Sequence, residues 1–90
     1  MSHTIREKSK LLARVRRIRG QVEAVERALD SEIGCADVLQ LVAAVRGAIS
    51  GLTAELIDDH ITEHILAASS TKEREEAARE LSEVVRTYLK

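Results

Sequence analysis

Length, composition and charge restrict this protein to few classes. Its 90 residues include no proline, four glycines and one aromatic residue, Tyr88, which favours long helices over sheets and suits a single domain over residues 1–90. One cysteine excludes an intrachain disulfide. We expect no signal peptide and no apolar run of membrane-spanning length, and therefore a cytoplasmic protein without a membrane partner.

The net charge of −1 conceals a basic segment near the N-terminus. Residues 6–19 hold seven basic side chains against one acidic side chain, whereas the rest of the chain holds seven basic and fourteen acidic residues. A solvated helix face explains most runs of charge. Clustering of this kind nevertheless favours an anion-binding surface, with nucleic acid as the first candidate.

Apolar spacing predicts two long helices that form an antiparallel hairpin. Over residues 5–30, apolar residues recur in steps of four and three, at Leu11, Val15, Ile18, Val22, Val25 and Leu29. A second seam predicts a helix over residues 36–67, at Val38, Val42, Val45, Ile49, Leu52 and Leu56. Between them, Gly34 is free to adopt the backbone angles of a turn.

A short C-terminal helix is predicted over residues 72–88. Ser69-Ser70-Thr71 provides a stop and an N-cap, and Thr71 with the acidic residues after it suits a helix start. The buried residues of this helix are expected to be Ala77, Ala78, Leu81, Val84, Val85 and Leu89. The predicted fold class is therefore all-α, with three helices.

Two histidines continue the apolar stripe of the second helix. His60 and His64 are four residues apart, so they share a helix face and suit chelation of one ion. For an isolated pair, two exposed or core-edge histidines are the slightly favoured reading. Adding the third histidine, His3, and the only cysteine, Cys35, gives a ligand set suited to a borderline transition metal.

Helix length shows that one chain cannot complete this site. About 25 residues, or roughly 37 Å, separate Cys35 from His60 if residues 36–67 form one helix. Antiparallel pairing of two copies brings the partner's Cys35 to His60 and His64, with a crossing near residue 48. Small residues there permit close helix approach, namely Gly47, Ala48, Ser50 and Gly51.

The N-terminus is expected to join this site. The hairpin places residue 3 opposite residue 63, so His3 approaches the two histidines of its own chain. The Ser2 amine, after removal of Met1, and Glu63 are further candidate ligands or ligand supports.

Three stretches of the chain resemble the CsoR/RcnR family of bacterial metal-sensing repressors. They are Arg14-Val-Arg-Arg-Ile-Arg-Gly-Gln-Val, the segment from Cys35 through Val38-Leu-Gln-Leu-Val-Ala-Ala-Val-Arg-Gly-Ala, and His60-Ile-Thr-Glu-His64. The resemblance covers essentially the whole chain. It implies an antiparallel dimer that pairs into a dimer of dimers, binds operator double-stranded DNA without metal, and releases it when the effector binds.

The residues at the effector-binding positions indicate which branch of the family this chain resembles. His3, Cys35, His60 and His64 match the nickel/cobalt branch (RcnR- and DmeR-like), which implies a Ni(II)- or Co(II)-responsive repressor of an efflux gene; Zn(II) also fits these ligands. The alternative is a formaldehyde-responsive repressor of the FrmR-like branch that uses Cys35 as nucleophile. That branch has proline at position 2 and glutamate at position 64, where this chain has Ser2 and His64.

The resemblance also implies DNA contacts from the basic first helix and from the second helix. The candidates are Lys10, Arg14, Arg16, Arg17, Arg19, Gln21 and Arg46. The four arginines of the first helix cannot all share one face, and backbone and shape readout is favoured over reading of bases. A metalloenzyme and a pure oligomerisation module are the remaining alternatives. The chain is too short for an obvious substrate pocket, so we expect neither an enzyme nor an organic substrate.

Overall fold

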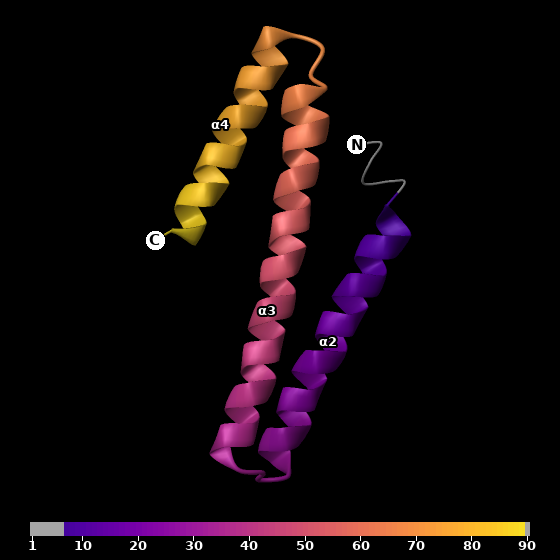
Figure 1. Cartoon of the computed structure of the whole chain (residues 1–90), viewed down its shortest axis with the longest axis vertical. Coiled ribbons are helices and arrows are strands. Elements are labelled where there is room, and N and C mark those ends of the chain that lie inside the picture. Colours follow the sequence, from indigo (N-terminus) through magenta and orange to yellow (C-terminus); the bar gives the residue numbers. More distant parts are fainter. Residues whose placement is uncertain (1–6, 90) are drawn as a thin grey trace. The chain divides into compact units, whose positions relative to one another are not determined.

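The computed structural model describes residues 7–89 and is almost entirely helical over this range (Figure 1). The elements in chain order are α2 (Lys8–Asp30), α3 (Cys35–His60), the π-helical segment η1 (Ile61–Leu66) and α4 (Thr71–Tyr88). Residues 7–89 contain no strand. The all-α prediction with three main helices is therefore confirmed. Contacts divide the described residues into two compact units, residues 7–53 and residues 54–89.

A tight turn joins α2 to α3 in the first unit. The Ile33 N–H donates to Ala28 O at 3.1 Å and the Glu32 N–H donates to Leu29 O at 3.2 Å. These two bonds form a Schellman motif that satisfies the last carbonyls of α2. Glu32, with φ of 55°, takes the left-handed conformation, and no described glycine has a positive φ. The expectation that Gly34 provides this freedom was wrong. Gly34 O instead accepts the first hydrogen bonds of α3.

Each predicted apolar seam divides into two rows, of which the hairpin covers one. On α2, Leu11 and Ile18 are buried, whereas Val15, Val22 and Leu29 are exposed. A step of four residues turns about 40° around a helix, so the two rows point in different directions. One partner helix covers only the first row. The hairpin therefore buries only part of the predicted seam of α2.

The same division occurs on α3 within the first unit. Val38 and Val45 are half-buried, whereas Val42 and Ile49 are exposed, at 46% each. Further along the helix, Leu52 is half-buried and Leu56 is exposed. No residue of α3 is fully buried. The helix thus carries an uncovered apolar row that repeats every seven residues.

In the second unit, α4 packs against η1. The helix begins at Thr71, and its N-cap is Ser70, whose Oγ accepts from the Glu73 N–H at 3.1 Å. Ser69 Oγ donates to the Glu73 carboxylate at 2.8 Å, and Arg74 donates to the carbonyls of Ile65 and Ala68. These bonds satisfy a backbone N–H group at the start of α4 and backbone carbonyl groups at and just after the end of η1.

The predicted core of α4 is only partly correct. Ala77 is buried and Leu81 is half-buried. The other expected core residues are exposed, namely Ala78, Val84, Val85 and Leu89. Beyond Ala77 and Leu81, the apolar side of α4 has nothing covering it in the second unit.

The Ser70 cap gives a direct test of this connection. We expect Ser70→Ala to lower the free energy of unfolding by about 1 kcal/mol, because the Glu73 N–H loses its acceptor. Urea unfolding followed by circular dichroism measures this change. Ser82→Ala, at an exposed position inside the same helix, serves as the control and should not lower stability, because alanine is the better helix former. Equal effects of the two substitutions would contradict the capping role.

One described stretch is long and apolar enough to cross a membrane by length and composition. It runs from Cys35 to Leu66 with a mean hydropathy of 1.4 in its most apolar window, none of which is buried in the protein. The expectation that no run approaches this length was wrong. A helix that packs in the core of a soluble assembly has the same composition, so the stretch is weak support for a membrane span.

Candidate metal centre and nucleic-acid interface

His60 and His64 lie side by side where α3 passes into η1. Their ring centroids are 5.2 Å apart, and the ring planes are inclined by 49°. Both side chains are half-buried. The structure therefore brings together two of the three histidines of the predicted ligand set, as binding of one ion by two ring nitrogens requires.

A hydrogen bond to α4 orients the His60 ring. Nε2 of His60 lies 2.9 Å from Ala77 O. A carbonyl oxygen only accepts, so Nε2 carries the proton and donates it. In the neutral ring, Nδ1 is then the nitrogen with a lone pair for a metal ion. Bonds of this kind commonly fix the tautomer and direction of a metal-binding histidine.

His64 belongs to the π-helical turn rather than to a regular α-helix. η1 covers Ile61–Leu66, and the Ala67 N–H donates to Thr62 O across five residues at its end. Short π-helical turns are rare and occur often at functional sites. Sequence spacing predicted a continuous α-helix here, because i, i+4 periodicity does not distinguish a single π turn from an α turn.

Cys35 is the first residue of α3 and is exposed. A helix of 26 residues is about 39 Å long, and His60 is the last residue of the same helix. Within residues 7–89, no three His, Cys, Asp or Glu side chains are arranged to hold a metal ion. The two histidines therefore provide part of a coordination shell. The predicted ligands His3 and Ser2 lie outside the described residues.

Two acidic side chains accompany the histidines. Glu63, a candidate ligand or support, is half-buried in η1 beside a cavity of about 290 Å³ that His64 also lines. Asp59 has a buried Oδ2 with no hydrogen-bond partner among the described residues. The sequence could not indicate this, since burial of a single carboxylate oxygen has no signature in residue spacing.

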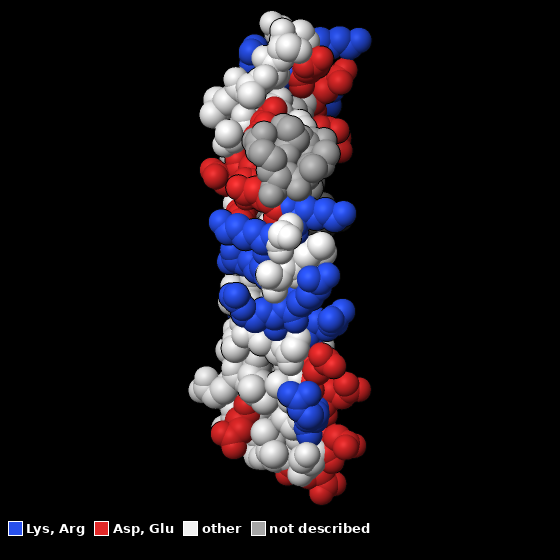
Figure 2. Space-filling model, turned by 90° about the vertical axis from the view of Figure 1, so that its right-hand side faces the viewer, with Lys and Arg blue, Asp and Glu red and all other residues white. Residues whose placement is uncertain are grey.

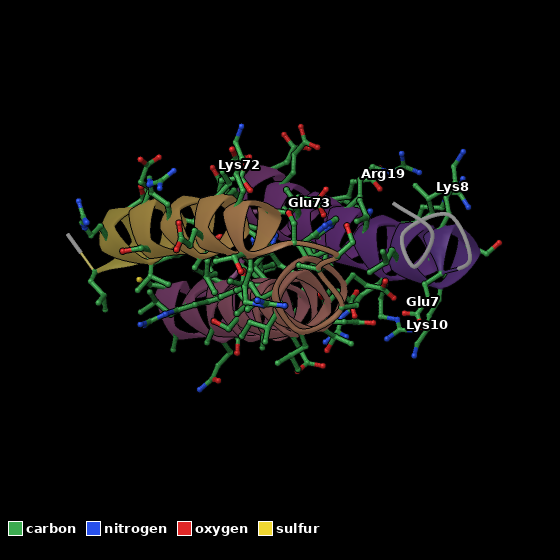
Figure 3. The ribbon with its side chains drawn as sticks, turned by 90° about the horizontal axis from the view of Figure 1, so that it is seen from above. Glu7, Lys8, Lys10, Arg19, Lys72 and Glu73 are labelled. Carbon is green, nitrogen blue, oxygen red and sulfur yellow. The ribbon has the colours of Figure 1, made fainter. Side chains whose placement is uncertain are left out.

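Basic side chains gather on the N-terminal half of α2. Figure 2, which looks onto this helix, shows Lys and Arg there and acidic residues towards its C-terminal end. They do not form one face: Figure 3 shows Lys8 and Arg19 on one side of α2 and Lys10 on the other. Several of the predicted DNA contacts are exposed, namely Lys10, Arg16, Arg17, Arg19 and, on α3, Arg46.

Two predicted DNA contacts, Arg14 and Gln21, differ from the others. Both are half-buried and, being seven residues apart, lie on the same side of α2. The Arg14 guanidinium lies against Gly51 of α3. Gln21 has a buried Oε1 with no hydrogen-bond partner among the described residues. These two side chains share a side of α2 with buried Ala28, and the contact of Arg14 with Gly51 had no signal in the sequence.

Comparison with known proteins agrees with this all-helical architecture. The family description "Metal-sensitive transcriptional repressor" matches residues 7–87. The transcriptional repressor RcnR of Salmonella typhimurium strain LT2 is 49% identical over 90 residues, which is the full length of both chains. Solved structures of related regulators also match the fold of this chain.

Two such structures match nearly the whole chain. A glutamate-to-histidine variant of the formaldehyde-responsive regulator FrmR from Salmonella enterica serovar Typhimurium superimposes with a TM-score of 0.85 and 44% identity, covering 92% of this chain and 94% of that one. The nickel-responsive transcriptional regulator InrS gives a TM-score of 0.75 and 34% identity, covering 89% and 90%.

Fold, site and relatives together define a small helical transcriptional regulator rather than an enzyme. The chain belongs to the family of metal-sensitive transcriptional repressors. The predicted membership of the CsoR/RcnR family and the predicted repressor function are thereby confirmed. Binding of DNA and self-association follow as general properties of such a repressor.

Proposed function

We propose that this repressor senses Ni(II) or Co(II) through His3, His60 and His64 of one subunit and the partner's Cys35. The His60–His64 pair is the observation that carries the proposal, because its two rings lie 5.2 Å apart with the His60 tautomer fixed. Several nitrogen donors with one thiolate suit Ni(II) and Co(II) better than Cu(I), which prefers soft ligands. Zn(II) is the closest competitor for the same ligands.

The remaining ligands come from a second copy in this proposal. Cys35 and His60 are the first and last residues of a helix of 26 residues, which separates them within one chain by about 37 Å. The uncovered rows on the hairpin, which include Val15, Val22, Val42 and Ile49, offer a surface that an antiparallel copy can bury. Two such dimers then form the tetramer. Residues 1–90 act as one functional domain, since the family description spans both compact units.

Operator double-stranded DNA is the proposed partner of the basic half of α2, with Arg46 of α3 as a further contact. Exposed Lys and Arg side chains neutralise phosphates, so affinity depends strongly on salt. A protein that acts on operator DNA in a bacterium works in the cytoplasm. Metal causes release only if it binds the DNA-incompetent conformation more tightly, because a ligand without differential affinity shifts no equilibrium.

Spectroscopy of the cobalt complex tests the metal assignment. We expect one Co(II) per subunit, with intense thiolate-to-cobalt charge-transfer bands in the near ultraviolet. Weak d–d bands in the visible range will report the coordination geometry. The same titration of a Ser31→Ala control, exposed and outside the ligand set, should give an unchanged spectrum. A Co(II) complex without charge-transfer bands would exclude Cys35 as a ligand.

Formaldehyde sensing is the second candidate, since a FrmR variant shares 44% identity with this chain. Cys35 is exposed as the first residue of α3, so its thiol is accessible to a small electrophile. Treating the protein–DNA complex separately with Ni(II), Co(II), Zn(II), Cu(I) and formaldehyde distinguishes the two. Release by nickel or cobalt supports the proposal, and release by formaldehyde alone overturns it.

A further inference from the structure

Arg74 of α4 bridges two backbone carbonyls at the end of η1. Its Nε–H donates to Ile65 O at 3.2 Å, and its Nη2–H donates to Ala68 O at 3.4 Å. Ile65 follows His64 within the π-helical segment, and Ala68 lies just beyond the end of that segment. All of these residues belong to the compact unit of residues 54–89. Because a guanidinium holds its donors in a rigid plane, one side chain fixes both carbonyls relative to each other.

The turn that Arg74 holds is the last turn of the π-helix. The Ala67 N–H donates to Thr62 O at 3.1 Å, and the Ala68 N–H donates to Ile65 O at 3.4 Å. The second of these backbone bonds is long, and Arg74 gives Ile65 O another donor at a shorter distance. The last carbonyls of a helix lack partners within the helix. Arg74 therefore supports the point at which the chain leaves η1.

The π-helical turn affects the direction of the His64 side chain. In an α-helix, side chains four residues apart point about 40° away from each other. A π-helix closes with bonds across five residues and so has more residues in each turn, which brings such side chains closer to the same direction. His64 is the fourth residue of η1, so most of the path from His60 is π-helical. The π turn therefore favours the alignment of the two rings.

The same side of α4 also holds the other histidine. His60 Nε2 donates to Ala77 O at 2.9 Å. Ala77 and Arg74 are three residues apart, so they are neighbours on one side of the helix. This side of α4 thus fixes the ring of His60 directly and the backbone beside His64 through Arg74.

We propose that Arg74 is a positioning residue of the metal centre: its two hydrogen bonds hold the end of η1, so that the His64 ring stays aligned with the His60 ring for one divalent ion. The inference rests on the proposed function, in which both histidines are ligands. A ligand that is held in place before the metal binds loses less conformational freedom when the complex forms. Arg74 therefore contributes to metal affinity without touching the metal.

Arg74→Ala separates positioning from electrostatics, because the two effects have opposite signs. Removal of a positive charge alone favours a divalent cation. Loss of positioning should instead weaken Co(II) binding about tenfold, the lower end of the effect of removing a group that supports a metal ligand. Competition with a chelator measures this affinity. We also expect the d–d bands of the cobalt complex to shift while the thiolate charge-transfer bands persist. Co(II) affinity at or above that of the wild type would overturn the proposal.

Hydrogen exchange of the metal-free protein tests the hold on η1 directly. The Ala67 amide closes the π turn onto Thr62 O, so its exchange reports how often the turn opens. Exchange measured by NMR should be at least about threefold faster in Arg74→Ala, because η1 loses two hydrogen bonds from a charged donor. An unchanged rate at Ala67 would show that η1 does not depend on Arg74.

Two variants of the same segment serve as controls. Arg79→Ala removes the same charge from an exposed position five residues later, on another side of α4, and should match the wild type in both measurements. Ser70→Ala weakens the cap of the same connection but leaves Arg74 in place. It should keep the Co(II) affinity of the wild type. An equal loss of affinity in Ser70→Ala would mean that any loosening of the connection suffices, which would overturn the proposal.

A double-mutant cycle shows whether Arg74 acts through His64. In a His64→Ala background, Arg74→Ala should have no further effect on Co(II) affinity, because the ligand that it positions is gone. An equal loss in both backgrounds would overturn the proposal. If the wild type binds no Co(II), or if His64→Ala binds it as tightly as the wild type, the proposed function itself fails. A failure confined to Arg74→Ala contradicts only this inference, so the two failures are distinguishable.

Discussion

Cys35→Ala is expected to abolish metal-induced release of DNA while leaving DNA binding by the metal-free protein intact. Cys35 is the only thiol in the chain and is exposed at the start of α3, away from the basic half of α2 in sequence. Loss of a direct ligand should lower metal affinity at least about 100-fold, the upper end of the effect of removing a ligand's supporting partner. Competition with a metal chelator measures the affinity, and anisotropy of a labelled duplex measures release.

Two further measurements make this result specific. His64→Ala should also weaken metal binding, but the cobalt complex of that variant should keep its thiolate charge-transfer bands. Ser31→Ala lies near Cys35 in the same turn region and should respond to metal as the wild type does. If Cys35→Ala still released DNA on addition of nickel or cobalt, the site between subunits would have to be built from other ligands.

Ile49→Glu is expected to break the oligomer and, with it, both DNA binding and metal sensing. Ile49 is 46% exposed on the uncovered row of α3, which the proposed partner copy buries. Placing an unpaired charge there costs several kcal/mol, so the dissociation constant of the oligomer should rise at least about 100-fold. Analytical ultracentrifugation over a range of protein concentrations measures this change.

Gln40→Glu supplies the matched control. It adds the same charge to the same helix at an exposed position nine residues earlier, which is about half a turn away around the axis. We expect its oligomeric state and DNA affinity to stay those of the wild type. An intact oligomer in Ile49→Glu would show that the uncovered row of α3 is not the contact between copies.

Apolar periodicity was sufficient to predict the elements of this fold but not their packing. The predicted helices agree with α2, α3 and α4 because steps of three and four residues define a helix irrespective of its neighbours. The sequence could not show which row faces inward, since Val15 and Ile18 are chemically alike. Only Ile18 is buried. The hairpin provides one partner helix for α2, and one helix cannot cover both apolar rows.

The proximity of His60 and His64 could be predicted from the sequence, whereas the hydrogen bonds and backbone conformation around them could not. The spacing of His60 and His64 indicated neighbouring rings, which the structure has at 5.2 Å. The bond from His60 to Ala77 O could not be predicted, because any residue offers the same carbonyl. Likewise the Glu32 turn departs from the usual preference for glycine, and a residue-based rule selected Gly34 instead.

In the proposed oligomer, the uncovered rows of the hairpin would also make this repressor sensitive to its own abundance. If Val22 and Ile49, each nearly half exposed in the single chain, are buried only on assembly, mass action stabilises the fold as subunit concentration rises. Thermal melting should then occur at higher temperature in concentrated samples than in dilute ones. At low copy number, dissociated subunits would neither complete a metal site nor occupy an operator, so the cell's supply of the protein would itself set the threshold of repression.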